Sequence, residues 1–114
     1  MRVAVVTIAC LVGVVLAAPA WAQDGKLIEQ GAKIFADQKC NLCHSVAGKG
    51  NPKGALDAVG TKLTADEIRQ WIVSPKEMTA KTKAERKPPM KAYPNLSKTE
   101  VDALLAYLGG LKKK

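Results

Sequence analysis

Apolar residues recur at helical spacing in three stretches of the chain, which predicts three helices. The first runs roughly from Lys26 to Asp37, and Asp24 is its expected N-terminal cap. The second and third begin with the capping boxes Thr64–Glu67 and Ser97–Glu100. In such a box, a hydroxyl and a carboxylate satisfy backbone N–H groups that the first turn of a helix leaves free.

The ends of these helices are also marked in the sequence. Ser74-Pro75 interrupts the second helix, and Gly109-Gly110 ends the third. Residues 75–84 are expected to add a further turn or short helix, and long loops are expected at 45–63 and at about 85–96. No stretch alternates in the way that a half-buried β-strand requires. The predicted fold class is therefore all-α.

The first 22 residues have the pattern of a secretory signal peptide. A short basic start precedes an apolar run at 3–18 and the Ala-x-Ala cleavage site Pro19–Ala22. A retained membrane anchor is the alternative, but the apolar run is shorter than the roughly 18 residues expected of a spanning helix. A lipoprotein cleaved before Cys10 is disfavoured because the apolar run before that residue is too short. We therefore expect a cleaved leader at 1–22, one domain at 23–114 and a periplasmic location.

Cys40-Asn41-Leu42-Cys43-His44 reads C-x-x-C-H, the attachment motif of a c-type haem. Two thiols three positions apart can each form a thioether with one haem vinyl group, and the histidine that follows can ligate the iron. We therefore expect one covalent haem c, with Cys40 and Cys43 as thioether residues and His44 as the proximal iron ligand. The haem would carry the chemistry, and the fold would supply orientation and electrostatics.

The same residues have three alternative interpretations. A zinc site needs four Cys or His ligands, whereas the chain has 3 cysteines and 1 histidine, and Cys10 lies in the predicted leader. A redox-active C-x-x-C would normally lie at a helix start in a βαβ pattern, and no such pattern is visible. A structural Cys40–Cys43 disulfide would close a very small loop. Haem attachment is favoured because the single histidine, His44, occupies the position that the motif requires.

With these motifs, the sequence resembles the class I cytochromes c, of the small bacterial monohaem type, over nearly all of residues 23–114. Gly31 and Phe35 precede Cys40 as a glycine and an aromatic residue do in the N-terminal helix of that family. There the glycine lets the helix cross closely over the C-terminal helix, whose aromatic residue would here be Tyr107. The resemblance implies a class I cytochrome c fold, with three to five short helices wrapped around one covalently attached haem.

The loop Lys87–Ser97 is similar to the family segment that delivers the distal iron ligand, which implies Met90 as that ligand. A thioether is a soft, neutral ligand that favours ferrous over ferric iron, so a His/Met pair raises the reduction potential. Several prolines stiffen this loop and reduce the entropy lost on holding the sulfur in place. Met78 is the alternative ligand, but it lies in a lysine-rich stretch without such prolines.

Two further features concern the surroundings of the haem. Trp71 lies on the apolar face of the second predicted helix; the resemblance implies a contact with a haem propionate, and simple core packing is the other interpretation. The family has a Gly-Pro-x-Leu segment whose proline carbonyl accepts the Nδ1–H of the proximal histidine. Its match here is Lys53–Leu56, with Gly54 in place of the proline. The acceptor would be Gly54, or Pro52 if the loop shifts.

The balance of charge indicates the kind of partner. Lysine and arginine number 18 against 10 aspartates and glutamates, which gives a formal net charge of +8. Basic residues flank both haem-binding segments, namely Lys39, Lys49 and Lys53 around the first, and Arg86, Lys87 and Lys91 around the second. Positive charge around a haem edge steers acidic partners into place. We expect redox proteins with acidic docking surfaces, or a periplasmic dehydrogenase, as partners; nucleic acid is not expected, nor is stable membrane insertion once the leader is removed.

The resulting hypothesis is a periplasmic carrier that transfers single electrons through a low-spin His/Met-ligated haem. It is not expected to be an enzyme, because both axial positions are filled and the only histidine is used on the iron. Two alternatives stay open. One is a dedicated haem c electron-transfer subunit of a periplasmic dehydrogenase complex. The other is an open-site haem enzyme or gas sensor, in which Met90 does not bind the iron.

Overall fold

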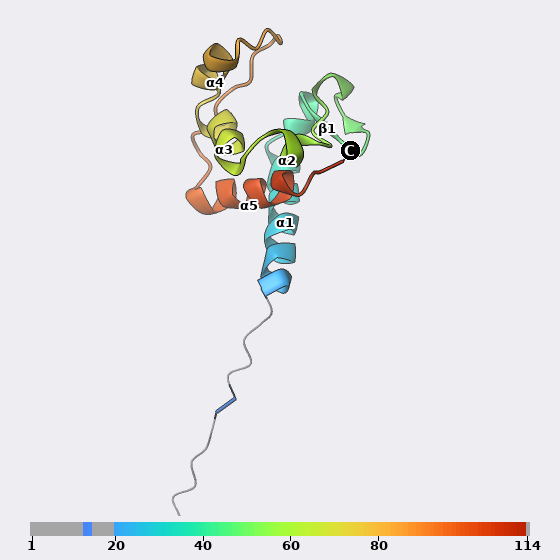
Figure 1. The fold of residues 1–114 in the computed structure, drawn as a ribbon, viewed down its shortest axis with the longest axis vertical. Helices are drawn as coiled ribbons and strands as arrows, with labels where there is room; N and C mark the ends of the chain where they lie inside the picture. Colours follow the sequence, from blue (N-terminus) through green and yellow to red (C-terminus); the bar gives the residue numbers. More distant parts are fainter. Residues whose placement is uncertain (1–12, 15–19, 114) are drawn as a thin grey trace, which may run out of the picture.

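The computed structural model describes residues 13–14 and 20–113 of the chain (Figure 1). Its elements are, in order, α1 (Ala20–Asp37), the 3-10 turn η1 (Cys40–Leu42), β1 (Ser45–Val46), β2 (Lys49–Gly50), the 3-10 turn η2 (Pro52–Gly54), α2 (Val59–Lys62), α3 (Ala65–Val73), α4 (Pro75–Thr82) and α5 (Lys98–Gly109). The described part is mostly helical, with five α-helices and one two-stranded sheet, which confirms the predicted fold class. None of the helices in that part is long and apolar enough to cross a membrane.

Helix α1 crosses α5 at close range, and Gly31 makes this approach possible (Figure 1). A Cβ atom at Gly31 would overlap the backbone carbonyl of Ala103, so a side chain does not fit there at this helix separation. One turn further along α1, the ring of Phe35 meets that of Tyr107 edge-on, with centroids 5.7 Å apart and an interplanar angle of 68°. The predicted crossing is confirmed. It holds the end of α1, which leads directly into the C-x-x-C-H motif, against α5.

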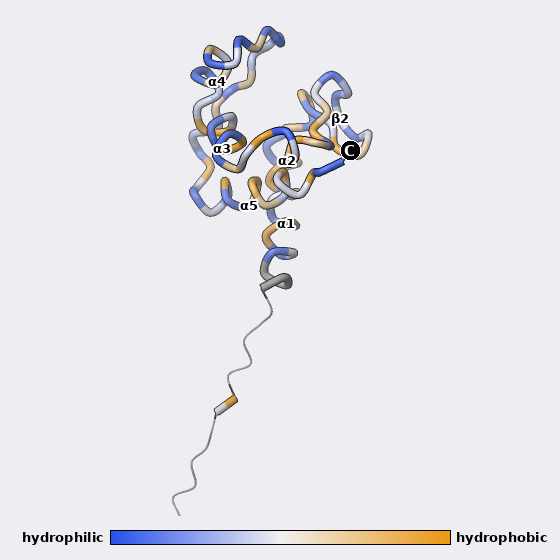
Figure 2. Tube along the Cα trace, viewed as in Figure 1, coloured by the Kyte–Doolittle hydropathy of each residue, from blue (hydrophilic) through white to orange (hydrophobic). Residues whose placement is uncertain are grey.

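The hydrophobic core lies where α1, α3 and α5 meet. Its buried members are Phe35, Ile68, Ile72, Val101, Leu104 and Leu108. Hydrophobic residues recur among hydrophilic ones along α3 and α5 (Figure 2), as expected of helices with one buried face. Arg69 of α3 forms an ion pair with Asp102 of α5, and Lys98 pairs with the same carboxylate at 3.1 Å. Apolar contact and charge therefore both hold α3 to α5.

Both predicted capping boxes are present. The Thr64 hydroxyl accepts the backbone N–H of Glu67 at 3.2 Å, and the Glu67 carboxylate accepts that of Thr64 at 3.0 Å. Ser97 and Glu100 form the same pair of bonds at the start of α5. The stretch expected to hold a turn or short helix forms α4. Local side-chain chemistry thus sets where α3 and α5 begin, as the sequence predicts.

The predicted start of the first helix is wrong. Helix α1 begins at Ala20, so Asp24 lies inside it and does not cap it. The residues just before Asp24 include two alanines and no helix breaker, and they extend the helix backwards. Most of the predicted leader at 1–22 lies outside the described residues, since only 13–14 and 20–22 of it are described. The cleavage of that leader stays a prediction.

The predicted loop at 45–63 contains short elements that the sequence analysis missed. Strands β1 and β2 pair in antiparallel fashion, Ser45 with Gly50 and Val46 with Lys49. Ala47 and Gly48 connect them with φ angles of 52° and 79°, as a tight hairpin turn requires. Strands of two residues are too short to produce an alternating pattern, which explains why the sequence did not indicate them.

The segment after α5 returns to α2 and holds the 45–63 region in place. The N–H of Gly60 donates to the carbonyl of Leu111 at 2.8 Å, and that of Lys113 to the carbonyl of Asp57 at 2.9 Å. The Asp57 carboxylate also accepts the N–H of Ala47 at 2.7 Å. These bonds join the hairpin, α2 and the end of α5 into one wall.

We predict that Gly31→Ala lowers the free energy of unfolding by about 1–3 kcal/mol, because its methyl group would force α1 and α5 apart. The matched control is Gly25→Ala in the same helix, where an added Cβ meets nothing within 4 Å. The control should raise stability by about 0.5–1 kcal/mol through its better helix propensity. Denaturant unfolding of the holoprotein measures both. Equal stability of the two variants would contradict the close crossing.

We predict a pH-dependent effect of Asp102→Asn. The hydrogen bond from Arg69, with that from Lys98, holds the pKa of Asp102 below its usual value. The stabilisation from this carboxylate is therefore present above about pH 4 and is lost as the pH falls through the lowered native-state pKa. Asp102→Asn should unfold at lower denaturant concentration than the parent at about pH 7, and the gap should narrow toward about pH 3. Glu85→Gln, in the loop after α4, serves as the control for loss of an exposed acidic residue. If the difference in denaturant midpoint between Asp102→Asn and the parent stayed the same at all pH values, the ion pair would be excluded as its cause.

Candidate haem-binding site

An apolar cavity of about 870 Å³ lies between the end of α1, η1, α2, α3 and the loop before α5. Most of its walls are apolar side chains, among them Phe35, Leu56, Val59, Leu63, Ile68, Ile72, Leu96, Leu104 and Leu108. Its volume is within the range of about 300–1,000 Å³ that is usual for ligand and cofactor sites. The structure brings all the residues that the sequence analysis selected for the site to this cavity: Cys40, Cys43, His44, Trp71 and Met90.

The C-x-x-C-H motif forms a tight turn directly after α1. Lys39 has a left-handed backbone conformation, with φ 58°, which ends the approach from α1 and starts η1. The N–H groups of Cys43 and His44 both donate to the carbonyl of Cys40, at 3.2 and 2.9 Å. Cys40 is half-buried and Cys43 is exposed, and both thiols are free, so the Cys40–Cys43 disulfide considered above is not formed. The turn therefore presents two free thiols and one imidazole along the same cavity wall.

His44 is held by a hydrogen bond that determines its tautomer. Its Nδ1 lies 2.9 Å from the carbonyl oxygen of Gly54. A carbonyl only accepts hydrogen bonds, so Nδ1 carries the proton and Nε2 keeps its lone pair. Burial, with the positive charge of Arg86, lowers the pKa of His44 below its usual value, although the bond to Gly54 opposes this shift. The ring is therefore neutral near pH 7, which is the form that binds a metal.

The carbonyl that orients His44 is that of Gly54. The two candidates from the sequence were Gly54 and Pro52, and the structure gives the bond to Gly54. Gly54 ends η2, a turn stabilised by the Asn51 side chain, which accepts the N–H of Lys53 at 3.0 Å. A Cβ at Gly54 would overlap the carbonyl oxygen of Cys43 and a guanidinium nitrogen of Arg86. Proline, which carries a Cβ, does not fit this position as it is packed here.

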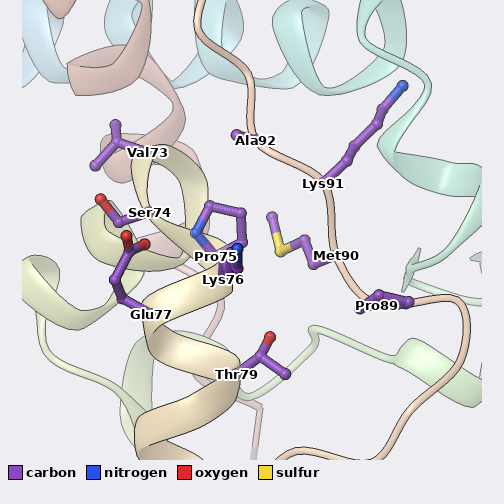
Figure 3. Close-up of a pocket in the computed structure, with 10 residues that line it drawn as sticks. All are labelled: Val73, Ser74, Pro75, Lys76, Glu77, Thr79, Pro89, Met90, Lys91 and Ala92. Atoms are coloured by element: carbon purple, nitrogen blue, oxygen red, sulfur yellow. The ribbon is translucent and has the colours of Figure 1, made fainter.

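The two candidate methionines lie in different surroundings. Met90 is partly buried and lines the large cavity, whereas Met78 is only 3% exposed and does not line it. Met90 also lines a second cavity of about 690 Å³ between α4 and the loop before α5. Figure 3 shows its side chain extending from that loop toward Pro75 at the start of α4. Of these two methionines, Met90 alone lines the cavity that His44 also lines.

Trp71 and Tyr93 also line the large cavity. Trp71 is partly buried on α3. Tyr93 is also partly buried, and burial, with a smaller effect from Cys40 and Cys43, raises the pKa of its phenol. The Lys91 ammonium group lies 5.5 Å from the centre of the Tyr93 ring. Tyr93 was not expected in the site, because its position three residues after Met90 does not indicate that the loop turns its side chain inward.

The cavity also has a basic rim. Lys39, Lys62, Arg86 and Lys91 line it, and no aspartate or glutamate is among its lining residues in the described part of the chain. Three of these were expected from the sequence as flanking charges. Lys62 was not, because it lies on α2 and is far from both motifs in the sequence. Fixed positive charge at the rim suits a group that carries anionic substituents.

The donor set and the cavity fit a covalently attached haem. Two free thiols lie three positions apart on one wall, a neutral imidazole with a free Nε2 follows them, and the walls are apolar and large enough for a flat macrocycle. Among the described residues, no three His, Cys, Asp or Glu side chains are gathered so that they could hold a metal ion themselves. Haem therefore accounts for this combination of residues, which a zinc site does not.

Comparison with known proteins agrees with this site. The cytochrome c family model matches residues 28–112. Two curated relatives are the cytochrome c oxidase subunit 2 of Alkalihalophilus pseudofirmus, 30% identical over 95 residues, and that of Bacillus subtilis, 27% identical over 103 residues. The matches cover 75% and 78% of this chain but only 26% and 28% of the relatives, so the chain spans about a quarter of their length. No solved structure gives a significant match. Because the family model covers the helices, the C-x-x-C-H motif and the Met90 loop together, the chain belongs to the cytochrome c family.

Proposed function

We propose that this protein is a periplasmic monohaem electron carrier with His44 and Met90 as the axial iron ligands and Cys40 and Cys43 as the thioether residues. Membership of the cytochrome c family implies haem-based electron transfer. The observation that carries the finer proposal is that two distant segments, the motif at 40–44 and the loop with Met90, line one apolar cavity. Haem supplies a one-electron couple when bound.

The chain's own residues would keep the iron environment unchanged between oxidation states. The Gly54 carbonyl holds the His44 ring in one orientation and makes Nε2 a better donor. The Met90 thioether is a soft ligand that favours the reduced iron. Pro88 and Pro89 precede Met90, and Pro94 follows it. These prolines restrict the loop, so little conformational entropy is lost when the loop is held in place. Apolar walls exclude water, which lowers the dielectric around the site.

The basic rim supports redox proteins with acidic docking surfaces as partners. Four basic residues line the cavity, and we expect electrons to enter and leave at its opening. Export to the periplasm rests on the leader pattern at 1–22 and on the extracytoplasmic location that c-type haem attachment requires.

A second candidate function is that of a haem unit within a larger respiratory assembly. Both curated relatives are oxidase subunits of which the matching region is about a quarter. Co-purification of this chain with an oxidase or dehydrogenase at fixed stoichiometry would favour that role, and a monomer that exchanges electrons in free solution would favour the carrier.

The axial ligands are tested by two methionine variants. Met90→Ala should abolish the weak charge-transfer band near the red end of the ferric spectrum, because that band reports iron–sulfur ligation, and it should let CO bind the ferrous protein. Met78→Ala should keep the band and lower the free energy of unfolding by about 2–5 kcal/mol, because it leaves a cavity in the core. Loss of the band in Met78→Ala alone would overturn the assignment.

The docking role of the basic rim is tested by ionic strength. Electron transfer to an acidic partner should slow by about tenfold or more as salt is raised, because screening weakens steering. Lys91→Gln should reduce both the low-salt rate and its salt dependence. Lys26→Gln, an exposed residue of α1 that does not line the cavity, removes the same charge and should have little effect. A rate independent of salt would leave the rim without a steering role.

A further inference from the structure

The guanidinium group of Arg86 lies against the bare Cα of Gly54, beside the His44–Gly54 hydrogen bond. A Cβ built on Gly54 would overlap Nη1 of Arg86 and would lie 2.9 Å from Nδ1 of His44, so these two nitrogens flank the same point. The side chain therefore brings a permanent charge next to the residue that would bind the iron.

The absence of a side chain at Gly54 leaves room for the Arg86 guanidinium. Any larger residue would fill the space that Nη1 occupies, and it would also collide with the carbonyl of Cys43. Arg86 itself comes from the loop after α4, four residues before Met90, and it is distant in sequence from the C-x-x-C-H motif. Its side chain thus links the segment that orients His44 with the loop that carries Met90.

We propose that Arg86 is a positioning residue of the haem site, whose guanidinium, seated on Gly54, orients the His44–Gly54 pair and holds a positive charge beside it that favours the reduced state. This inference rests on the proposed ligation of the iron by His44. It assigns a role in setting the reduction potential to a residue that otherwise belongs only to the basic rim.

The physical reason is electrostatic. Reduction of ferric to ferrous iron adds one electron, taken from a redox partner protein, and changes no bond. A nearby positive charge stabilises the state with one more electron. A guanidinium beside Nδ1–H also opposes any build-up of negative charge on the imidazole, which weakens the donation that favours ferric iron. Both effects raise the reduction potential.

The test is the reduction potential of the purified holoprotein, measured with Arg86→Gln, Arg86→Lys and the control Lys83→Gln. Arg86→Gln should reduce the equilibrium constant for reduction by about three- to tenfold, where tenfold corresponds to about 59 mV for one electron. Arg86→Lys should restore part of the change, because it keeps the charge but not the planar group. Lys83→Gln removes one charge from the same exposed segment and should shift the potential much less.

The role of the contact between the Arg86 guanidinium and Gly54 is tested by adding Gly54→Ala. In that background Arg86 is displaced, so Arg86→Gln should have little further effect on the potential. Two results would overturn the inference, provided that the spectra keep their low-spin His/Met features. One is that Arg86→Gln shifts the reduction potential equally in the parent and in the Gly54→Ala background. The other is that Lys83→Gln shifts the potential as much as Arg86→Gln does. Spectra of the parent protein that lack those features would instead overturn the proposed ligation.

Discussion

At Gly31, helix α1 comes so close to α5 that the backbone of Ala103 occupies the space where a side chain would begin. The rings of Phe35 and Tyr107 pack one turn further on, and the motif at 40–44 follows after Lys39, which has a left-handed backbone conformation. The position of the thiols and of His44 relative to α3 and α5 therefore depends on this crossing. If α1 stood further from α5, the turn that presents these groups would no longer face the Met90 loop.

The hydrophobic core is small and largely shared with the cavity. Six buried apolar side chains from three helices form the core, and all of them except Val101 also line the cavity. Short chains bury a limited fraction of their surface, and they commonly depend on a disulfide, a metal or a cofactor. In this chain, a large apolar group in the cavity would complete the contacts that α2, α3 and the loop before α5 make only in part. The same walls that bind the group would then also hold the fold.

The surroundings of His44 show how a residue other than the expected proline can supply the same hydrogen-bond acceptor. Where the family resemblance leads one to expect a proline, Gly54 supplies the same backbone carbonyl to His44 at 2.9 Å. The hydrogen bond needs only a carbonyl, so the side chain is free to vary. The absent Cβ in turn leaves room for Arg86, which brings charge from another part of the chain. Gly54 therefore supplies the acceptor for His44 and at the same time leaves space for the Arg86 guanidinium.

Much of this molecule was already determined by its sequence. Capping boxes at Thr64 and Ser97, the apolar spacing of α3 and α5, and Gly31 all act through neighbours within a turn or through the absence of a side chain, so the helices and their crossing were predictable. The motif at 40–44 was equally local. The start of α1 and the hairpin at 45–50 were not predictable, because nothing breaks the helix before Asp24 and two-residue strands carry no periodicity.

Only the tertiary structure decided that Gly54 accepts from His44, that Met90 lines the cavity while Met78 fills the core, and that Arg86 reaches Gly54. Each of these depends on how segments far apart in the sequence meet in space, which a local pattern does not record.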